Sequence, residues 1–72
     1  MRDPTNYDRA EWASLAVKDH ACRTNSQDED AQTKLSDLLC NLRHFADVIG
    51  IDWDSAIERA SMHYEAEAEN EE

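Results

Sequence analysis

The sequence contains very little glycine or proline, with one of each among 72 residues. All-β folds use both residues at their many turns, so this scarcity excludes a turn-rich β fold and favours long helices. A chain of this length forms one domain at most and buries only about 60% of the surface that its unfolded chain exposes. We therefore expect a single helical domain over residues 1–72, with a thin core.

Long hydrophobic runs are also missing, because no apolar stretch approaches the roughly 18 residues that a membrane span needs. Met1, Arg2 and Asp3 lead directly into polar sequence, which predicts no signal peptide and a cytoplasmic location. Hydrophobic residues make up 40% and charged residues 33% of the chain, a composition typical of a soluble folded domain. Domains this small usually need additional support from disulfides, metal ions or self-association.

Cysteine is scarce, with only Cys22 and Cys40 present. Two cysteines do not make a disulfide framework, so we expect both to be reduced and packed as small hydrophobes. Cys40 and His44 stand one helical turn apart, a spacing that suits two zinc ligands. His20 and Cys22 would have to complete the site, but residues two apart point to opposite sides of a helix. The sequence therefore predicts no metal site and no cofactor.

Basic residues are few: seven Lys and Arg stand against 17 Asp and Glu, which gives a formal net charge of −10. Residues 50–72 hold eight of the acids and one base, Arg59. Because Lys and Arg must neutralise phosphates, this composition excludes direct binding to nucleic acid and to anionic membranes. Two interpretations of the acidic surface remain. It keeps the chain soluble, or it engages a basic protein surface that normally holds nucleic acid.

Hydrophobic periodicity predicts an all-α fold, a small three-helix bundle with a frayed acidic C-terminal tail. The predicted helices span about residues 6–23, 27–49 and 53–66, and packing is expected to end near Tyr64. Apolar residues recur at the i, i+3, i+4 and i+7 spacing along the second and third helices. The predicted core consists of Trp12, Leu15, Leu35, Leu38, Leu39, Leu42, Phe45, Ile49, Trp53, Ile57 and Tyr64.

Capping residues mark the ends of the predicted helices. Ser26 and Glu29 are spaced as a capping box, which predicts the start of the second helix. Gly50 follows the last apolar residue of that helix, where a left-handed residue commonly ends a helix. Asp52 is then placed to cap the third helix.

The first helix has a wider apolar arc than one core face requires. At about 100° per residue, Trp12 and Leu15 fall on one side and Ala13, Val17 and Ala21 fall on another. Either this helix lies in the centre of the bundle, or its second side meets a partner. We predict the second arrangement, with Ala13, Val17 and Ala21 mediating self-association as a homodimer. Small side chains at these positions would let two helices approach closely.

Asp37, Asn41 and His44 share one face of the second helix, opposite the leucines. A carboxylate beside an imidazole could serve as an acid–base pair, whereas the alternative is a solvated face. No nucleophile and no phosphate-binding loop stands near them in the sequence. We therefore predict no catalytic residues and keep this face as a secondary candidate for partner binding.

The preferred candidates for partner binding are Asp52, Asp54, Glu58 and Glu65 in the third helix. Asp54, Glu58 and Glu65 are spaced 4 and 7 residues apart. At these spacings they stack along the helix with rises of roughly 6 and 10 Å. A carboxylate row of this kind crudely imitates the phosphates of a nucleic-acid strand.

The stretch from Leu38 to Glu65 resembles a group of small, mostly uncharacterised proteins of bacteriophages and other mobile elements. Their shared motif is Asp-Leu-Leu, then His, then Gly-Ile-Asp-aromatic, then Ala, and then His-Tyr-x-x-Glu. Here the motif begins one residue before this stretch, at Asp37, and passes through His44 and Gly50 to His63. The resemblance implies a phage or prophage origin and carries no activity. Together with size and charge, it predicts a non-enzymatic, anti-CRISPR-like inhibitor that binds a basic host protein.

A second resemblance is to MazG-type nucleotide pyrophosphohydrolases, which are all-α enzymes. The segments Lys34-Leu35-Ser36-Asp37-Leu38-Leu39 and Gly50-Ile51-Asp52 are similar to the family's Glu-Leu-x-Asp-Val-Leu and Gly-Ile-Asp. Only Asp37 matches a metal-binding carboxylate, and Lys34 stands where the family has Glu. A magnesium site needs several carboxylates, and a lysine there would repel the ion. A degenerate hydrolase, or a structural or regulatory adaptor, is the alternative to the inhibitor.

Overall fold

Three α-helices make up the described part of the chain. In this computed structural model, which describes residues 3–70, α1 spans Asn6–Arg23, α2 spans Ala31–Ile49 and α3 spans Trp53–Asn70. No strand occurs within residues 3–70. The all-α, three-helix fold expected from the sequence is therefore confirmed.

A complete capping box begins α1. The hydroxyl of Thr5 accepts a hydrogen bond from the N–H of Asp8 at 3.1 Å, and the Asp8 carboxylate accepts one from the N–H of Thr5 at 2.9 Å. After the helix, Asn25 takes a φ of 58°, a left-handed conformation that asparagine tolerates better than most residues. These local interactions fix α1 at the residues predicted from the sequence.

The start of α2 lies later than predicted, because Ser26 belongs to the turn after α1. Its N–H donates to the Ala21 carbonyl at 2.7 Å, which ties Ser26 to the end of α1. The capping box predicted at Ser26 and Glu29 is therefore wrong. The N-cap of α2 is Asp30, whose Oδ1 accepts from the N–H of Thr33 at 2.8 Å.

The turn between α2 and α3 follows the prediction. Gly50 has a φ of 77°, and its N–H donates to the Ala46 carbonyl. Asp52 caps α3, since its carboxylate accepts from the N–H of Ser55 at 3.2 Å. The helix then continues to Asn70, so the tail predicted to fray from residue 66 is helical up to that point. Residues 71–72 of that tail lie outside the described residues.

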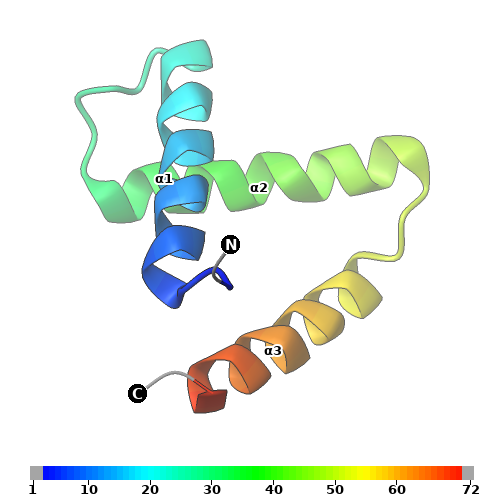
Figure 1. Ribbon diagram of the computed structural model, residues 1–72. Coiled ribbons are helices and arrows are strands. Elements are labelled where there is room, and N and C mark those ends of the chain that lie inside the picture. Colours follow the sequence, from blue (N-terminus) through cyan, green and yellow to red (C-terminus); the bar gives the residue numbers. More distant parts are fainter. Residues whose placement is uncertain (1–2, 71–72) are drawn as a thin grey trace.

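The three-helix bundle is open rather than closed (Figure 1). In this view α1 crosses α2 steeply, and α3 runs back below α2 toward the beginning of α1. The radius of gyration is 14.1 Å, compared with about 11 Å for a compact domain of this length. The helices therefore bury little of their surface against one another.

Most of the predicted core is exposed in the single chain. Among the described residues only Ala21 and Ala46 are buried, and Leu38 and Trp53 are half-buried. The other predicted core residues are exposed by between 41% and 71%; they are Trp12, Leu15, Leu35, Leu39, Leu42, Phe45, Ile49, Ile57 and Tyr64. Their assignment to the core of one chain is wrong, because the open arrangement leaves their stripes uncovered.

The side of α1 that faces the rest of the chain is the opposite of the predicted one. Ala21 is buried and Val17 is half-buried, whereas Trp12 and Leu15 are exposed. Small side chains allow close helix crossing, so this side packs within the chain. The prediction that a second copy contacts Ala21 is therefore wrong, and Val17 is only partly accessible. Of the predicted self-association residues, Ala13 alone is exposed.

Candidate functional site

The acidic row of α3 consists of Asp54, Glu58, Glu65 and Glu69. At about 100° per residue, these positions fall within about 60° of the helix circumference. All of these side chains are exposed, and the salt bridges found among the described residues, Arg9–Glu67 and Arg23–Asp19, do not include them. The sequence prediction missed Glu69, although the i+4 spacing from Glu65 points to it. The acidic row is therefore open to a partner.

Asp52, the other predicted partner-binding residue, has a structural task at the start of α3. Its two carboxylate oxygens accept from the N–H and from the hydroxyl of Ser55, each at 3.2 Å. The positive end of the helix dipole stabilises a carboxylate at this place. Asp52 is exposed but already engaged, so the acidic row carries the charge that remains available.

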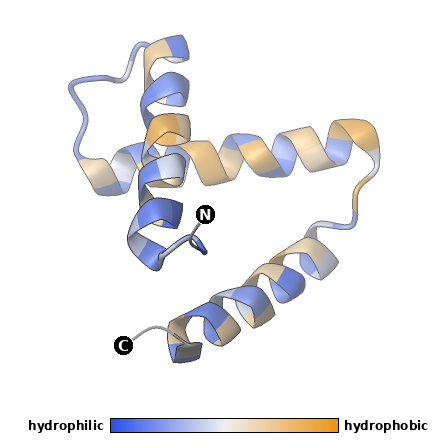
Figure 2. Ribbon diagram, viewed as in Figure 1, coloured by the Kyte–Doolittle hydropathy of each residue, from blue (hydrophilic) through white to orange (hydrophobic). Residues whose placement is uncertain are grey.

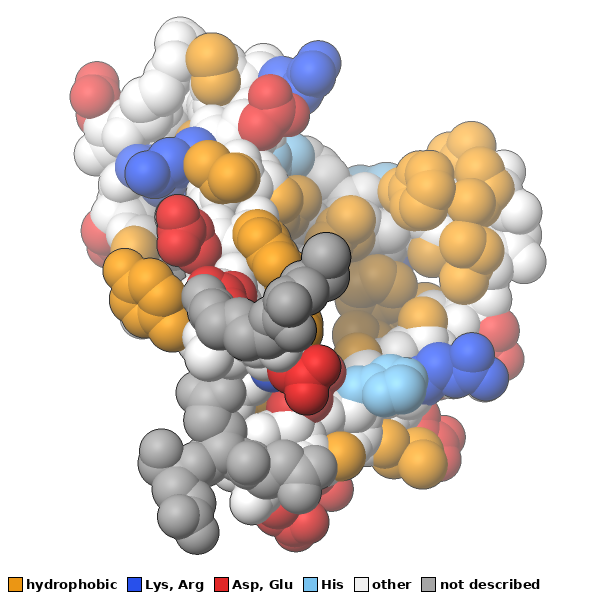
Figure 3. Space-filling model, in the orientation of Figure 1, with side chains coloured by type: hydrophobic (Ala, Val, Ile, Leu, Met, Phe, Trp, Pro, Cys, Tyr) orange, Lys and Arg blue, Asp and Glu red, His pale blue; other side chains and the backbone are white. Residues whose placement is uncertain are grey.

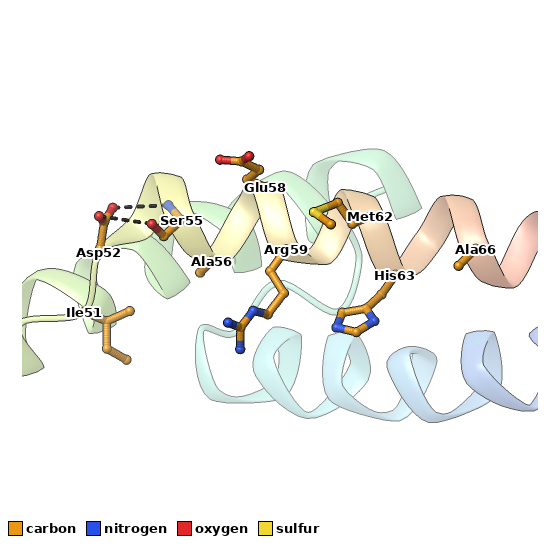
Figure 4. Close-up of a pocket in the computed structure, with 9 residues that line it drawn as sticks. All are labelled: Ile51, Asp52, Ser55, Ala56, Glu58, Arg59, Met62, His63 and Ala66. Atoms are coloured by element: carbon orange, nitrogen blue, oxygen red, sulfur yellow. Dashed lines mark hydrogen bonds between the residues drawn. The ribbon is translucent and has the colours of Figure 1, made fainter.

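A groove of about 990 Å³ lies beside the acidic row, and Glu58 belongs to both. Arg59 and His63 extend from one side of α3, whereas Glu58 points away to the other (Figure 4). The lining residues are Ile51, Asp52, Ser55, Ala56, Glu58, Arg59, Met62, His63 and Ala66. The groove thus offers apolar contacts next to the carboxylates, a combination that suits the rim and centre of a protein interface.

The secondary candidate face on α2 is partly covered by α1. The amide Nδ2 of Asn41 lies 2.8 Å from Nε2 of His20, and because an amide nitrogen can only donate, the ring nitrogen accepts. Asp37 is half-buried and His44 is exposed. Asn41 is itself exposed, so α1 covers the face formed by Asp37, Asn41 and His44 only in part. The other ring nitrogen of His20, Nδ1, is buried and has no hydrogen-bond partner among the described atoms.

Metal-ligating side chains do not gather within residues 3–70, where no three His, Cys, Asp or Glu residues could hold one ion. Cys22 and Cys40 are both free and exposed. The prediction that they pack as small hydrophobes is therefore wrong. The open bundle leaves both thiols uncovered. His20, which would have had to complete a zinc site, contacts Asn41.

None of the described helices is both long and apolar enough to span a membrane. No family model, no curated protein and no solved structure matches the chain. The candidate site is therefore defined by the structure of this chain, and it consists of the acidic row and the adjoining groove.

Proposed function

We propose that this chain is a non-enzymatic, phage-type inhibitor that binds a basic surface of a nucleic-acid-binding protein in the cytoplasm of a bacterial host. The supporting observation is the acidic row, in which Asp54, Glu58, Glu65 and Glu69 are exposed on one side of α3. The net charge of −10 adds long-range attraction toward a basic partner. The resemblance of residues 38–65 to phage proteins supports the proposed setting.

The acidic row acts mainly on the rate and the orientation of binding. Each exposed contact between a carboxylate and a cation contributes about 0–1 kcal/mol. Several such contacts together steer the approach of the partner and fix its register. Asp54 and Glu58, like Glu65 and Glu69, are separated by a rise of roughly 6 Å along the helix. The row can therefore lie along a strip of Lys and Arg side chains that otherwise holds phosphates.

Retention of a host protein at controlled salt tests this proposal. The immobilised full chain is incubated with bacterial lysate at low ionic strength, and the retained proteins are identified by mass spectrometry. We expect a basic nucleic-acid-binding protein that is released by added double-stranded DNA. Retention should weaken steeply with salt, because the Debye length shrinks to about 8 Å at 0.15 M. A retained protein that DNA and salt both fail to displace would contradict the proposal.

Charge reversal then locates the contact. The double variant Asp54→Lys with Glu58→Lys should lose the retained protein and keep its helical circular-dichroism spectrum, because both side chains are exposed. The matched control is Glu11→Lys with Asp28→Lys, which changes the net charge equally at exposed positions outside α3. An equal loss in the control would show that net charge alone acts. Unchanged binding by the α3 variant would refute the acidic row as the site.

A further inference from the structure

The chain exposes more surface than a compact protein of its mass. Its accessible surface is 6264 Å², whereas a compact folded chain of 8.3 kDa exposes about 4,600 Å². Much of the excess is apolar, since 13 large hydrophobic side chains are exposed among the described residues. Extended apolar surface of this kind marks an interaction site.

The exposed apolar surface is most regular on α2, where we define the α2 stripe as Leu35, Leu39, Leu42 and Ile49. These side chains are exposed by 41–54%. Leu35, Leu42 and Ile49 recur every seven residues, the repeat that allows two helices to pack along a common seam. Figure 2 shows hydrophobic residues recurring along α2, and Figure 3 shows hydrophobic side chains in the hollow between the helices.

The position of α1 explains why the α2 stripe stays uncovered. The half-buried residues of α2 are Thr33, Lys34, Asp37 and Leu38, and Asn41 contacts His20 of α1. At about 100° per residue, Lys34, Leu38 and Asn41 lie on the flank of the stripe rather than at its centre. Helix α1 therefore packs beside the leucines and not over them.

We propose that the α2 stripe packs against the α2 stripe of a second copy of this chain, forming a symmetric homodimer. Each chain carries an excess of about 1,700 Å² of exposed surface, of which the α2 stripe is one part. A dimer that covered the whole excess would bury about 3,400 Å², inside the range of about 2,000–5,000 Å² that obligate homodimers bury. A two-fold axis requires a self-complementary patch, and the exposed apolar side chains on either side of the buried Ala46 supply one. The dimer goes beyond the proposed function, because it needs no foreign partner.

The charges distinguish the dimer contact from the binding of a basic partner. Each copy carries a net charge of −10, so two copies repel one another and salt screens that repulsion. The contact across the α2 stripe should therefore tighten as salt rises. Binding of the acidic row to a basic protein should weaken under the same change. Failure of one proposal is thus recognisable independently of the other.

Sedimentation equilibrium of the full chain tests the dimer. We expect a mass of twice 8.3 kDa at high micromolar concentration, and a dissociation constant that falls as sodium chloride is added. Leu39→Glu places a carboxylate in the stripe and should raise the dissociation constant by roughly 30-fold or more, as at an interface hot spot. The matched control, Val48→Glu, changes a residue of the same helix that is 84% exposed and lies off the stripe. It should leave the mass unchanged.

Three outcomes would overturn the proposal. They are a wild-type chain that sediments as a monomer, a dimer that Leu39→Glu leaves intact, and a dimer that Val48→Glu dissociates equally. If circular dichroism shows that Leu39→Glu is unfolded, Leu35→Ala takes its place, because alanine preserves helix propensity. A larger dissociation constant for Leu35→Ala than for wild type supports the dimer. An unchanged dissociation constant overturns it.

Discussion

Arg9 and Glu67 join the first helix of this chain to the last: Nε of Arg9 lies 3.2 Å from Oε2 of Glu67. The backbone carbonyl of Glu67 also accepts a hydrogen bond from Nδ2 of Asn6 at 3.2 Å. Packing of α3 had been expected to end near Tyr64, before this residue is reached. These polar contacts extend the packed part of α3 by almost another helical turn. They hold the end of α3 against the start of α1.

Reversing one charge of this ion pair should cost little stability, and reversing both charges should restore the stability that was lost. The two side chains are 34% and 40% exposed, so Arg9→Glu should lower the free energy of unfolding by about 1 kcal/mol or less. Glu67→Arg should behave similarly, and the combined variant should recover most of the loss. Urea denaturation at fixed protein concentration measures this as a double-mutant cycle. Additive losses in the combined variant would show that the pair does not orient α3.

Asn41 should contribute to the crossing of α1 and α2 through its 2.8 Å contact with His20. Asn41→Ala removes the donor, and we expect a loss of about 1 kcal/mol in the free energy of unfolding. The corresponding fall in Tm is about 4–8 °C for a domain of this size. Ser36→Ala, at an exposed position of the same helix, serves as the control. Equal melting of Asn41→Ala and wild type would show that the contact adds nothing.

Gly50 should resist replacement because of its backbone and not because of crowding. Its φ is 77°, and a Cβ built there meets no atom within 4 Å. Gly50→Ala should therefore destabilise the chain by about 1–2 kcal/mol through left-handed strain alone. Gly50→Asn should cost less, because asparagine visits this conformation more readily. Urea midpoints of the two variants check the order, and an equal effect would contradict the strain argument.

Asp30 should make helix stability depend on pH. Hydrogen bonds from the hydroxyl and the N–H of Thr33 hold the pKa of Asp30 below its ordinary value of 3.8. A lowered pKa stabilises the folded state above pH 3.8, and this contribution is lost as pH falls through the folded value. Asp30→Asn keeps a capping side chain that does not titrate. The stability difference between wild type and Asp30→Asn should shrink as pH falls from 5 to 2, and a constant difference would contradict this prediction.

Local signals were sufficient where a helix end depends only on its neighbours in the chain. Gly50 and Asp52 were identified from the sequence because a left-handed C-terminal residue and an N-terminal carboxylate act within one turn. The same logic failed at Ser26, whose N–H is bound by the carbonyl of Ala21 in the preceding helix. Asp30 caps α2 instead, a role that was not predicted for it from the sequence.

The sequence by itself determined the number of helices, most of their ends and the acidic row of α3, because helical periodicity and capping are local properties. Only the tertiary structure decided which side of α1 faces inward, since both of its apolar sides satisfy the same periodicity. The side of α1 that carries Ala21 packs against α2 because small side chains permit a close crossing. Trp12 and Leu15 are exposed as a result. The crossing lies on the flank of α2, so the leucines that periodicity assigned to a core remain exposed. Local pattern specifies that a stripe must be covered, but only the packing of whole helices decides what covers it.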